Sequence, residues 1–311
     1  MRTPVDVSVV IPCFNGRWII PRLAENLNTL RTGTIEVVFV DDGSTDGSLS
    51  LFKEQIPWGV CLRQEKKGLA AARNTGARAA RGEFIQFLDA DDTLNSGKLD
   101  AQVELSRRGR FDVVYSDWRM VIVSEDGEKP EPVERAEAPT EIIEALLGGW
   151  WCPPHAYIVR REAYLGCGGS DETLVNAQDF ELWMRLAVTG EKFGYLPGCF
   201  ANYYRYTQRT SLARGDRRQY WSDYEKAILK IVRMLEDRCE LNAPRRRAAA
   251  RRLHDVARNV YRIDASWFDR LLVEIYSLDP DFAPVGSWLY KTSAQIFGLK
   301  RAERLALWKR S

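Results

Sequence analysis

Phe84-Ile85-Gln86-Phe87-Leu88-Asp89-Ala90-Asp91-Asp92 joins an apolar run directly to three carboxylates. Five apolar or neutral residues in succession are typical of a central strand that is covered on both faces. The acidic cluster therefore falls at the carboxyl end of a strand, where open α/β sheets bind ligands. Hard oxygen ligands around one small residue favour Mg²⁺ or Mn²⁺ shared with phosphate oxygens. The alternative is structural, because Asp91 or Asp92 can also cap a following helix.

Strand-like and helix-like segments alternate around this run, which predicts an α/β fold with a mostly parallel sheet flanked by helices. The predicted strands are 7–11, 36–40, 60–62, 84–88 and 112–115, and the predicted helices are 18–30, one ending at 51, 68–80, 140–147 and 178–188. An Asp126-Gly127 turn within the polar stretch 121–139 predicts a hairpin and a surface excursion. The later segments 220–240, 244–262, 266–277 and 287–309 are expected to be helical. We therefore expect one domain over 1–214, with halves 1–117 and 118–214, and a helical extension over 215–311.

Composition excludes several classes of protein. Of the 311 residues, 45% are hydrophobic and 28% charged, which is ordinary for a globular protein. Six cysteines without a C-x-x-C pair and only two histidines argue against a structural zinc site and favour buried thiols in a reducing compartment. No apolar run reaches the roughly 18 residues of a membrane span. We expect a cytoplasmic protein.

Acidic residues follow two predicted strands, at Asp41-Asp42 and at Asp89 to Asp92, and a third acidic site, Asp179, lies farther along the chain. Parallel strands bring the first two groups to the same edge of the sheet. Neither G-x-G-x-x-G nor G-x-x-x-x-G-K-[ST] is present, so glycine-loop binding of a dinucleotide or a nucleoside triphosphate lacks its expected motif. Carboxylates can instead accept hydrogen bonds from base N–H groups and ribose hydroxyls, while a metal bridges the diphosphate.

Four motifs occur in order along the chain. They are Val7-Ser8-Val9-Val10-Ile11-Pro12-Cys13-Phe14-Asn15-Gly16, Val40-Asp41-Asp42-Gly43-Ser44-Thr45-Asp46-Gly47-Ser48, Gly68-Leu69-Ala70-Ala71-Ala72-Arg73-Asn74-Thr75-Gly76 and Phe87-Leu88-Asp89-Ala90-Asp91-Asp92. In this order they resemble the motifs of family 2 glycosyltransferases of the GT-A fold. The resemblance covers about 7–115 and is weaker over 150–212, where Gln178-Asp179-Phe180-Glu181-Leu182-Trp183 looks like the acceptor half. It implies that 1–117 binds a nucleotide sugar and that 118–214 binds the acceptor.

The family transfers a sugar from a nucleotide diphosphate with inversion at the anomeric carbon, and the resemblance assigns roles to single residues. Asp179 matches the general base, and Asp91 matches the ligand of Mn²⁺ or Mg²⁺. The expected donor nucleotide contacts are Pro12, Asn15, Asp41, Asp42, Lys67, Arg73 and Asp89. Candidate phosphate or acceptor contacts are Asp92, Trp151, His155, Arg205 and Arg209. The expected donor is a UDP-sugar, and the expected acceptor is a saccharide or a lipid-linked saccharide of cell-surface polysaccharide assembly.

Two departures from the family pattern keep other functions open. Gln178 stands where family members commonly have Glu, and Thr207 lies where a loop often carries His. A catalytically degenerate sugar-nucleotide-binding or scaffold protein is therefore one alternative. A nucleotidyltransferase is another, although no Gly-rich, basic phosphate loop follows the first strand.

The aromatic and basic segments each have two interpretations. Trp150 and Trp151 can stack on an acceptor sugar or fill a core, and His155 can be a hydrogen-bonding loop residue. Residues 215–311 carry 20 Lys and Arg against 13 Asp and Glu, whereas 1–214 carry 25 against 30. Basic helices with Leu and Trp can contact an anionic membrane peripherally, on its inner face, or pack on the first domain. The acidic remainder argues against nucleic acid as a partner.

Overall fold

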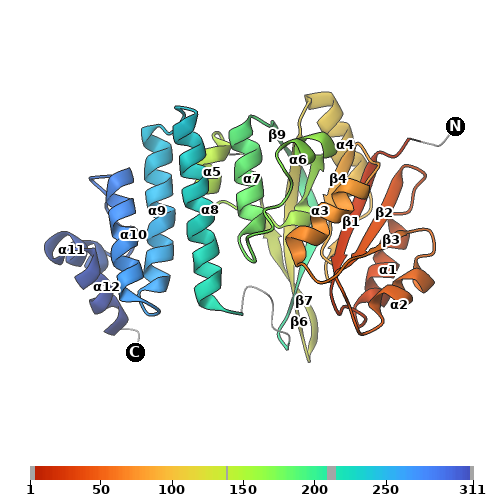
Figure 1. Ribbon diagram of the computed structural model, residues 1–311, viewed down its shortest axis with the longest axis horizontal. Coiled ribbons are helices and arrows are strands. Elements are labelled where there is room, and N and C mark those ends of the chain that lie inside the picture. Colours follow the sequence, from red (N-terminus) through yellow and green to blue (C-terminus); the bar gives the residue numbers. More distant parts are fainter. Residues whose placement is uncertain (1–3, 138, 209–214, 309–311) are drawn as a thin grey trace. The chain divides into compact units, whose positions relative to one another are not determined.

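The computed structural model describes residues 4–137, 139–208 and 215–308, and it confirms the predicted α/β class (Figure 1). It divides into two units, one made of Met1–Thr140 and Trp151–Ser211 and the other of Glu141–Trp150 and Leu212–Ser311. Residues 141–150, which the sequence placed in the half 118–214, thus group with the later helices. The assignment of donor and acceptor halves stays a prediction.

The first half of the sheet is parallel. Strands β1 (Val7–Cys13), β2 (Ile35–Asp41), β3 (Val60–Arg63) and β4 (Phe84–Phe87) lie in the order β3-β2-β1-β4. Every residue of β1 and of β4 is buried, as the continuous apolar runs predict for strands covered on both faces. Because β1 is parallel to both β2 and β4, the acidic residues that follow β2 and β4 leave the sheet at the same edge.

Beyond β4 the sheet becomes mixed. It continues with β8 (Tyr157–Arg160), β6 (Val113–Ser124), β9 (Phe193–Tyr206) and β5 (Thr93–Leu94), and β8 is antiparallel to both of its neighbours. Strand β7 (Gly127–Glu134) pairs with β6 through the predicted turn. The sequence did not predict β5, β8 or β9. The first two are short, and β9 contains Gly and Pro and pairs with β6 through register shifts, so it lacks a regular strand pattern.

The described residues of this unit form six α-helices. They are α1 (Ile20–Thr29), α2 (Ser48–Gln55), α3 (Leu69–Ala79), α4 (Lys98–Gly109), α6 (Arg161–Gly166) and α7 (Gln178–Thr189). Helix α3 packs closely on β1, because a Cβ atom at Gly76 would overlap the side chain of Val10. Small residues therefore bring α3, which carries Arg73, against the strands whose ends carry the acidic groups.

The second unit is helical. It contains α5 (Ile142–Leu147), α8 (Arg217–Asp237), α9 (Ala243–Val260), α10 (Ala265–Leu278), α11 (Trp288–Phe297) and α12 (Leu299–Trp308). Asp216, Asn242 and Asp264 cap α8, α9 and α10 by accepting hydrogen bonds from backbone N–H groups of the first turn. The single helix predicted over 287–309 is wrong, because Gly298 (φ +79°) separates α11 from α12. Among the described helices, none is both long and apolar enough to cross a bilayer.

Lys98 is a buried amine at the start of α4. Its side chain is fully buried, and Nζ donates to Oε1 of Gln102 (2.5 Å) and to Oε1 of Gln86 on β4. Burial lowers the pKa of Lys98 well below its ordinary 10.5. Between this lowered pKa and 10.5, the unfolded chain binds the proton of Lys98 more tightly than the folded protein does. The contribution of Lys98 to stability therefore increases as pH rises toward 10.5.

The variant Lys98→Met tests this arrangement. We expect the unfolding free energy of wild type to rise, relative to that of the variant, between about pH 7 and about pH 10. Urea denaturation at several pH values measures it, with the exposed Lys53→Met as the control. A difference independent of pH would show that Lys98 keeps its ordinary pKa.

Candidate active site

Asp42 organises the segment that leads into α3. The side chain of Asp42 is buried, and its carboxylate accepts hydrogen bonds from the backbone N–H groups of Lys67 (2.9 Å) and Gly68 (2.8 Å) and from Nε2 of Gln64 (2.7 Å). Both oxygens thus already have protein donors. Asp42 thereby fixes the backbone that carries the exposed Lys67, and its direct contact with a nucleoside stays a prediction.

Asp41 lies deeper, at the end of β2. It is fully buried, Oδ1 accepts from the N–H of Ser44 (3.1 Å), and Oδ2 lies 3.5 Å from Nε of Arg63 without accepting a hydrogen bond from the described part of the chain. Asn15 ties the neighbouring loops together, because its N–H donates to Oγ of Ser44 (2.9 Å) and its Oδ1 accepts from the N–H of Thr45 (2.9 Å). Pro12 is buried within β1. The buried acceptor on Asp41 and the exposed Asn15 suit a site for a nucleoside base.

Arg73 joins two of the acidic groups. Its side chain is 2% exposed, and its guanidinium donates to Oδ1 of Asp179 (2.5 Å) through Nη1 and to Oδ1 of Asp89 (2.9 Å) through Nη2. The two carboxylates raise the pKa of Arg73, although its burial alone would lower it. The structure thus brings together three predicted site residues from α3, from the end of β4 and from α7.

Asp179 lies in the first turn of α7 and remains partly accessible. Its side chain is 27% exposed, and only Oδ1 is engaged by Arg73. Removal from water raises the pKa of Asp179, Arg73 opposes that shift, and the charge of Asp89 adds to it. A carboxylate with a raised pKa and one accessible oxygen can take a proton from a bound hydroxyl.

Gln178 has a structural role in the turn before α7. Its Nε2 donates to the carbonyl oxygens of Leu174 (2.9 Å) and Val175 (2.8 Å). A glutamate at this position could make neither bond, because an ionised carboxylate only accepts. Gln178, which departs from the family pattern, therefore anchors the turn that positions Asp179.

Asp92 and His155 pair with each other in the interior. Nδ1 of His155 lies 3.0 Å from Oδ2 of Asp92, and the residues are 0% and 2% exposed, respectively. Oδ1 of Asp92 accepts from the N–H of Tyr204 (2.8 Å). Asp92 thus links the acidic loop, residues 89–92, to β9. Both side chains are enclosed in this structure, and their contact with phosphate or acceptor stays a prediction.

The remaining candidates lie at accessible positions. Trp151 is 40% exposed and packs edge-on against Trp118, so it can serve both as packing and as a platform for a sugar. Asp91 is half-buried, and Arg205 is exposed. Arg209 lies outside the described residues. No group of three His, Cys, Asp or Glu side chains within the described ranges could hold a metal by itself. Asp91 and Asp89 suit a hard cation that takes its other oxygens from a diphosphate.

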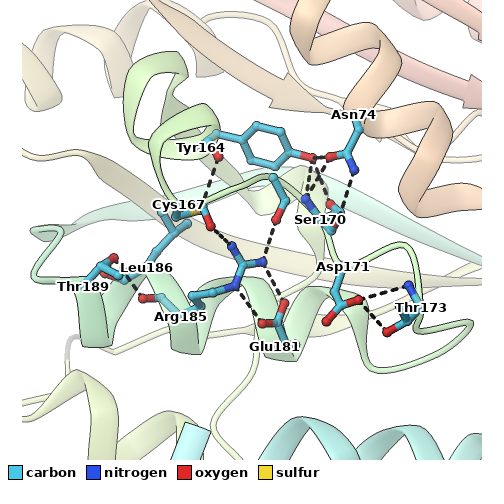
Figure 2. Close-up of polar contacts among 11 residues, drawn as sticks. Asn74, Tyr164, Cys167, Ser170, Asp171, Thr173, Glu181, Arg185, Leu186 and Thr189 are labelled. Carbon is cyan, nitrogen blue, oxygen red and sulfur yellow. Dashed lines mark hydrogen bonds and ion pairs between the residues drawn. The ribbon is translucent and has the colours of Figure 1, made fainter. Parts of the chain in front are cut away.

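A buried polar network fixes the loop before α7 (Figure 2). Arg185 pairs with Glu181 through Nε–Oε1 (2.7 Å) and Nη2–Oε2 (2.8 Å) and donates to the carbonyl oxygens of Cys167 and Gly169. Asn74, next to Arg73 on α3, donates to the carbonyl of Ser170 (2.9 Å). Sequence reasoning missed this network. The i, i+4 spacing of Glu181 and Arg185 could have predicted their ion pair on one helix. The carbonyl oxygens that Arg185 also contacts could not be predicted, because they come close only in the tertiary structure.

Comparisons with known proteins decide the family. The sequence model described as "Glycosyl transferase family 2" matches residues 8–165, which is about half of the chain. The chain belongs to glycosyltransferase family 2. It is 29% identical to the amylovoran biosynthesis glycosyltransferase AmsB of Erwinia amylovora over 238 residues, covering 72% of this chain and 79% of that protein. Seven other curated relatives are matched over only 27% to 61% of their own length.

Solved structures confirm the predicted GT-A fold. The crystal structure of S. aureus TarS 1-349 in complex with UDP-GlcNAc has a TM-score of 0.66 at 16% identity, over 98% of this chain and 92% of that one. The mannosyltransferase PcManGT from Pyrobaculum calidifontis, in complex with GDP-Man and Mn²⁺, has a TM-score of 0.54 at 18% identity, over 99% and 89%. The chain therefore has the GT-A architecture expected from its four motifs.

The variant Arg73→Met tests the junction of Asp89 and Asp179. We expect a loss of about 3 kcal/mol in unfolding free energy, because removing one partner leaves two partly buried carboxylates without their cation. The pKa of Asp179 should rise further, so the acidic limb of the pH–activity profile should move to higher pH. Denaturant titration and initial rates across pH measure the two effects.

Arg78→Met is the matched control, because Arg78 lies on the same helix and is exposed. It should leave stability within about 0.5 kcal/mol of wild type. Equal stability and an unmoved acidic limb for the Arg73 variant would contradict the role given to this arginine.

Proposed function

We propose that this glycosyltransferase is inverting and metal-dependent, and that it transfers a sugar from a UDP-sugar to a hydroxyl acceptor. The observation that carries the proposal is the Arg73 contact, which holds Asp89 of the acidic loop and Asp179 of α7 at one place. A donor-binding carboxylate and a partly exposed candidate base are thus neighbours. Direct displacement needs a leaving group and a deprotonated nucleophile on opposite faces of one carbon.

In the proposed reaction Asp179 accepts the proton of the acceptor hydroxyl. The hydroxyl oxygen then forms a bond to the anomeric carbon as the bond from that carbon to the diphosphate oxygen breaks. The nucleoside diphosphate leaves with the electron pair, and the configuration inverts. Asp91, with Asp89, would hold Mn²⁺ or Mg²⁺, which supplies positive charge to the departing diphosphate.

The donor and the acceptor are proposed from relatives. The TarS structure contains UDP-GlcNAc, whereas the PcManGT structure contains GDP-Man, so a uracil nucleotide is proposed first and a guanine nucleotide is the comparison. The name of AmsB refers to amylovoran biosynthesis, which supports an acceptor in polysaccharide assembly. A saccharide or a lipid-linked saccharide fits the exposed Trp151.

The alternatives have lost part of their support. The substitution at Gln178 pointed to a degenerate scaffold, but the amide anchors a turn and Asp179 is retained. The nucleotidyltransferase alternative shares the α/β plan and the acidic residues, but no Gly-rich, basic phosphate loop follows the first strand.

A thermal-shift screen of UDP- and GDP-sugars with and without Mn²⁺ tests the donor site. At about 100 times the dissociation constant a ligand adds roughly 2.7 kcal/mol, which corresponds to a shift of several degrees. We expect a Mn²⁺-dependent shift with UDP-sugars and a smaller one with GDP-mannose. The absence of any donor response would contradict the proposed function.

Two substitutions separate metal binding from catalysis. Asp91→Asn should abolish the Mn²⁺-dependent part of the donor shift. Asp179→Asn should keep that shift and lower the rate of transfer by at least about 100-fold, because the base is lost. The exposed Asp100→Asn on α4 is the matched control for both. Normal transfer by the Asp179 variant would remove this residue from the mechanism.

A further inference from the structure

The second unit exposes large apolar side chains in one short stretch. Between residues 285 and 305, six such side chains are at least 49% exposed. They are Val285 (62%), Trp288 (74%), Leu289 (53%), Ile296 (65%), Phe297 (50%) and Leu305 (49%). Single exposed apolar residues are normal, but a group of this size marks an interaction surface.

Three of these residues share one side of α11. Trp288, Leu289 and Ile296 occupy positions i, i+1 and i+8, which lie within an arc of about 100° on a helix. Tyr290 lies on the other side and is buried, and its hydroxyl contacts Nε2 of His254 (3.1 Å) and Oε1 of Glu303. These polar contacts fix the orientation of the helix. The side formed by Trp288, Leu289 and Ile296, here named the α11 face, therefore stays exposed.

The charges beside the α11 face are basic. Residues 285–311 contain six Lys and Arg and a single acidic residue, Glu303. Glu303 is buried, and its Oε1 accepts from Nε of Arg258 (2.7 Å), so its charge is compensated inside the unit. Lys300, Arg301 and Arg304 are exposed on α12, although Lys300 also pairs with Asp269 (2.6 Å). The exposed charge of this region is therefore positive.

We propose that α11 and α12 dock the protein on the surface of an anionic lipid bilayer. The α11 face enters the boundary between headgroups and acyl chains, and the basic side chains of α12 contact acidic headgroups. An exposed Trp, exposed aliphatic residues and adjacent Lys and Arg are the combination that binds such a surface, because apolar insertion and charge attraction add. This inference goes beyond the proposed function and does not depend on it.

Vesicle sedimentation of the full chain tests the proposal. The vesicles contain phosphatidylglycerol and phosphatidylcholine in a ratio of about 1:3, and pure phosphatidylcholine vesicles are the comparison. We expect sedimentation with the anionic vesicles that falls as salt is raised, because the charge attraction is screened. The double variant Trp288→Ser/Ile296→Ser should reduce vesicle affinity by at least about tenfold, because both apolar side chains are removed from the contact.

Two further variants complete the test. Val60→Ser/Val133→Ser, at exposed positions of β3 and β7, is the matched control and should sediment like wild type. Arg301→Gln/Arg304→Gln should weaken binding to anionic vesicles and leave binding to neutral vesicles unchanged. Circular dichroism and the melting temperature establish that each variant is folded, and donor thermal shifts without vesicles test the catalytic unit separately.

Several results would overturn the proposal. They are no sedimentation by the wild type, equal sedimentation with neutral and anionic vesicles, or sedimentation that Trp288→Ser/Ile296→Ser leaves unchanged. Light scattering that shows a dimer in wild type and a monomer in this variant would assign the α11 face to a second copy of the chain instead. A retained donor shift in any of these cases would leave the proposed function intact.

Discussion

The contact of one buried guanidinium with two carboxylates is the constraint on which the site depends. Arg73 is almost fully enclosed, so its charge requires Asp89 and Asp179 as partners. Those partners come from segments about 90 residues apart in sequence, and the cation therefore determines how close the acidic loop and α7 lie. The small residues of α3 matter for the same reason, because they let the helix that carries Arg73 approach β1.

Around this contact, several polar side chains hold the backbone of the neighbouring loops through hydrogen bonds. Asp42 holds the segment before α3, Gln178 holds the turn before α7, and Arg185 holds the carbonyls of the loop at Cys167 and Gly169. Buried hydrogen bonds of this kind cost much when broken, because the remaining partner stays desolvated. The loops that carry the accessible side chains are therefore ordered before any ligand arrives.

Much of the fold could be predicted from sequence, because the strands and turns of its first half follow local sequence patterns. Continuous apolar runs identified the parallel strands, and turn residues marked their ends. Strand β9 could not be predicted, since its irregular pairing with β6 is determined by tertiary contacts. In the site, motif position singled out Arg73, Asp89 and Asp179, which the structure brings into contact. It could not show that Arg73, Asp92 and His155 are almost fully buried, because a motif does not report burial.

The amide of Gln178 has a further consequence for how the turn before α7 responds to acid. Its two bonds to carbonyl oxygens involve no titrating group, so they persist over the whole pH range in which the protein is folded. A carboxylate in its place would change charge beside Asp179 and would couple the two titrations. With glutamine there, protonation of Asp179 changes the charge of the site without loosening the turn that holds it. The residue proposed for proton transfer, Asp179, and the residue that holds the turn, Gln178, are therefore different side chains at adjacent positions.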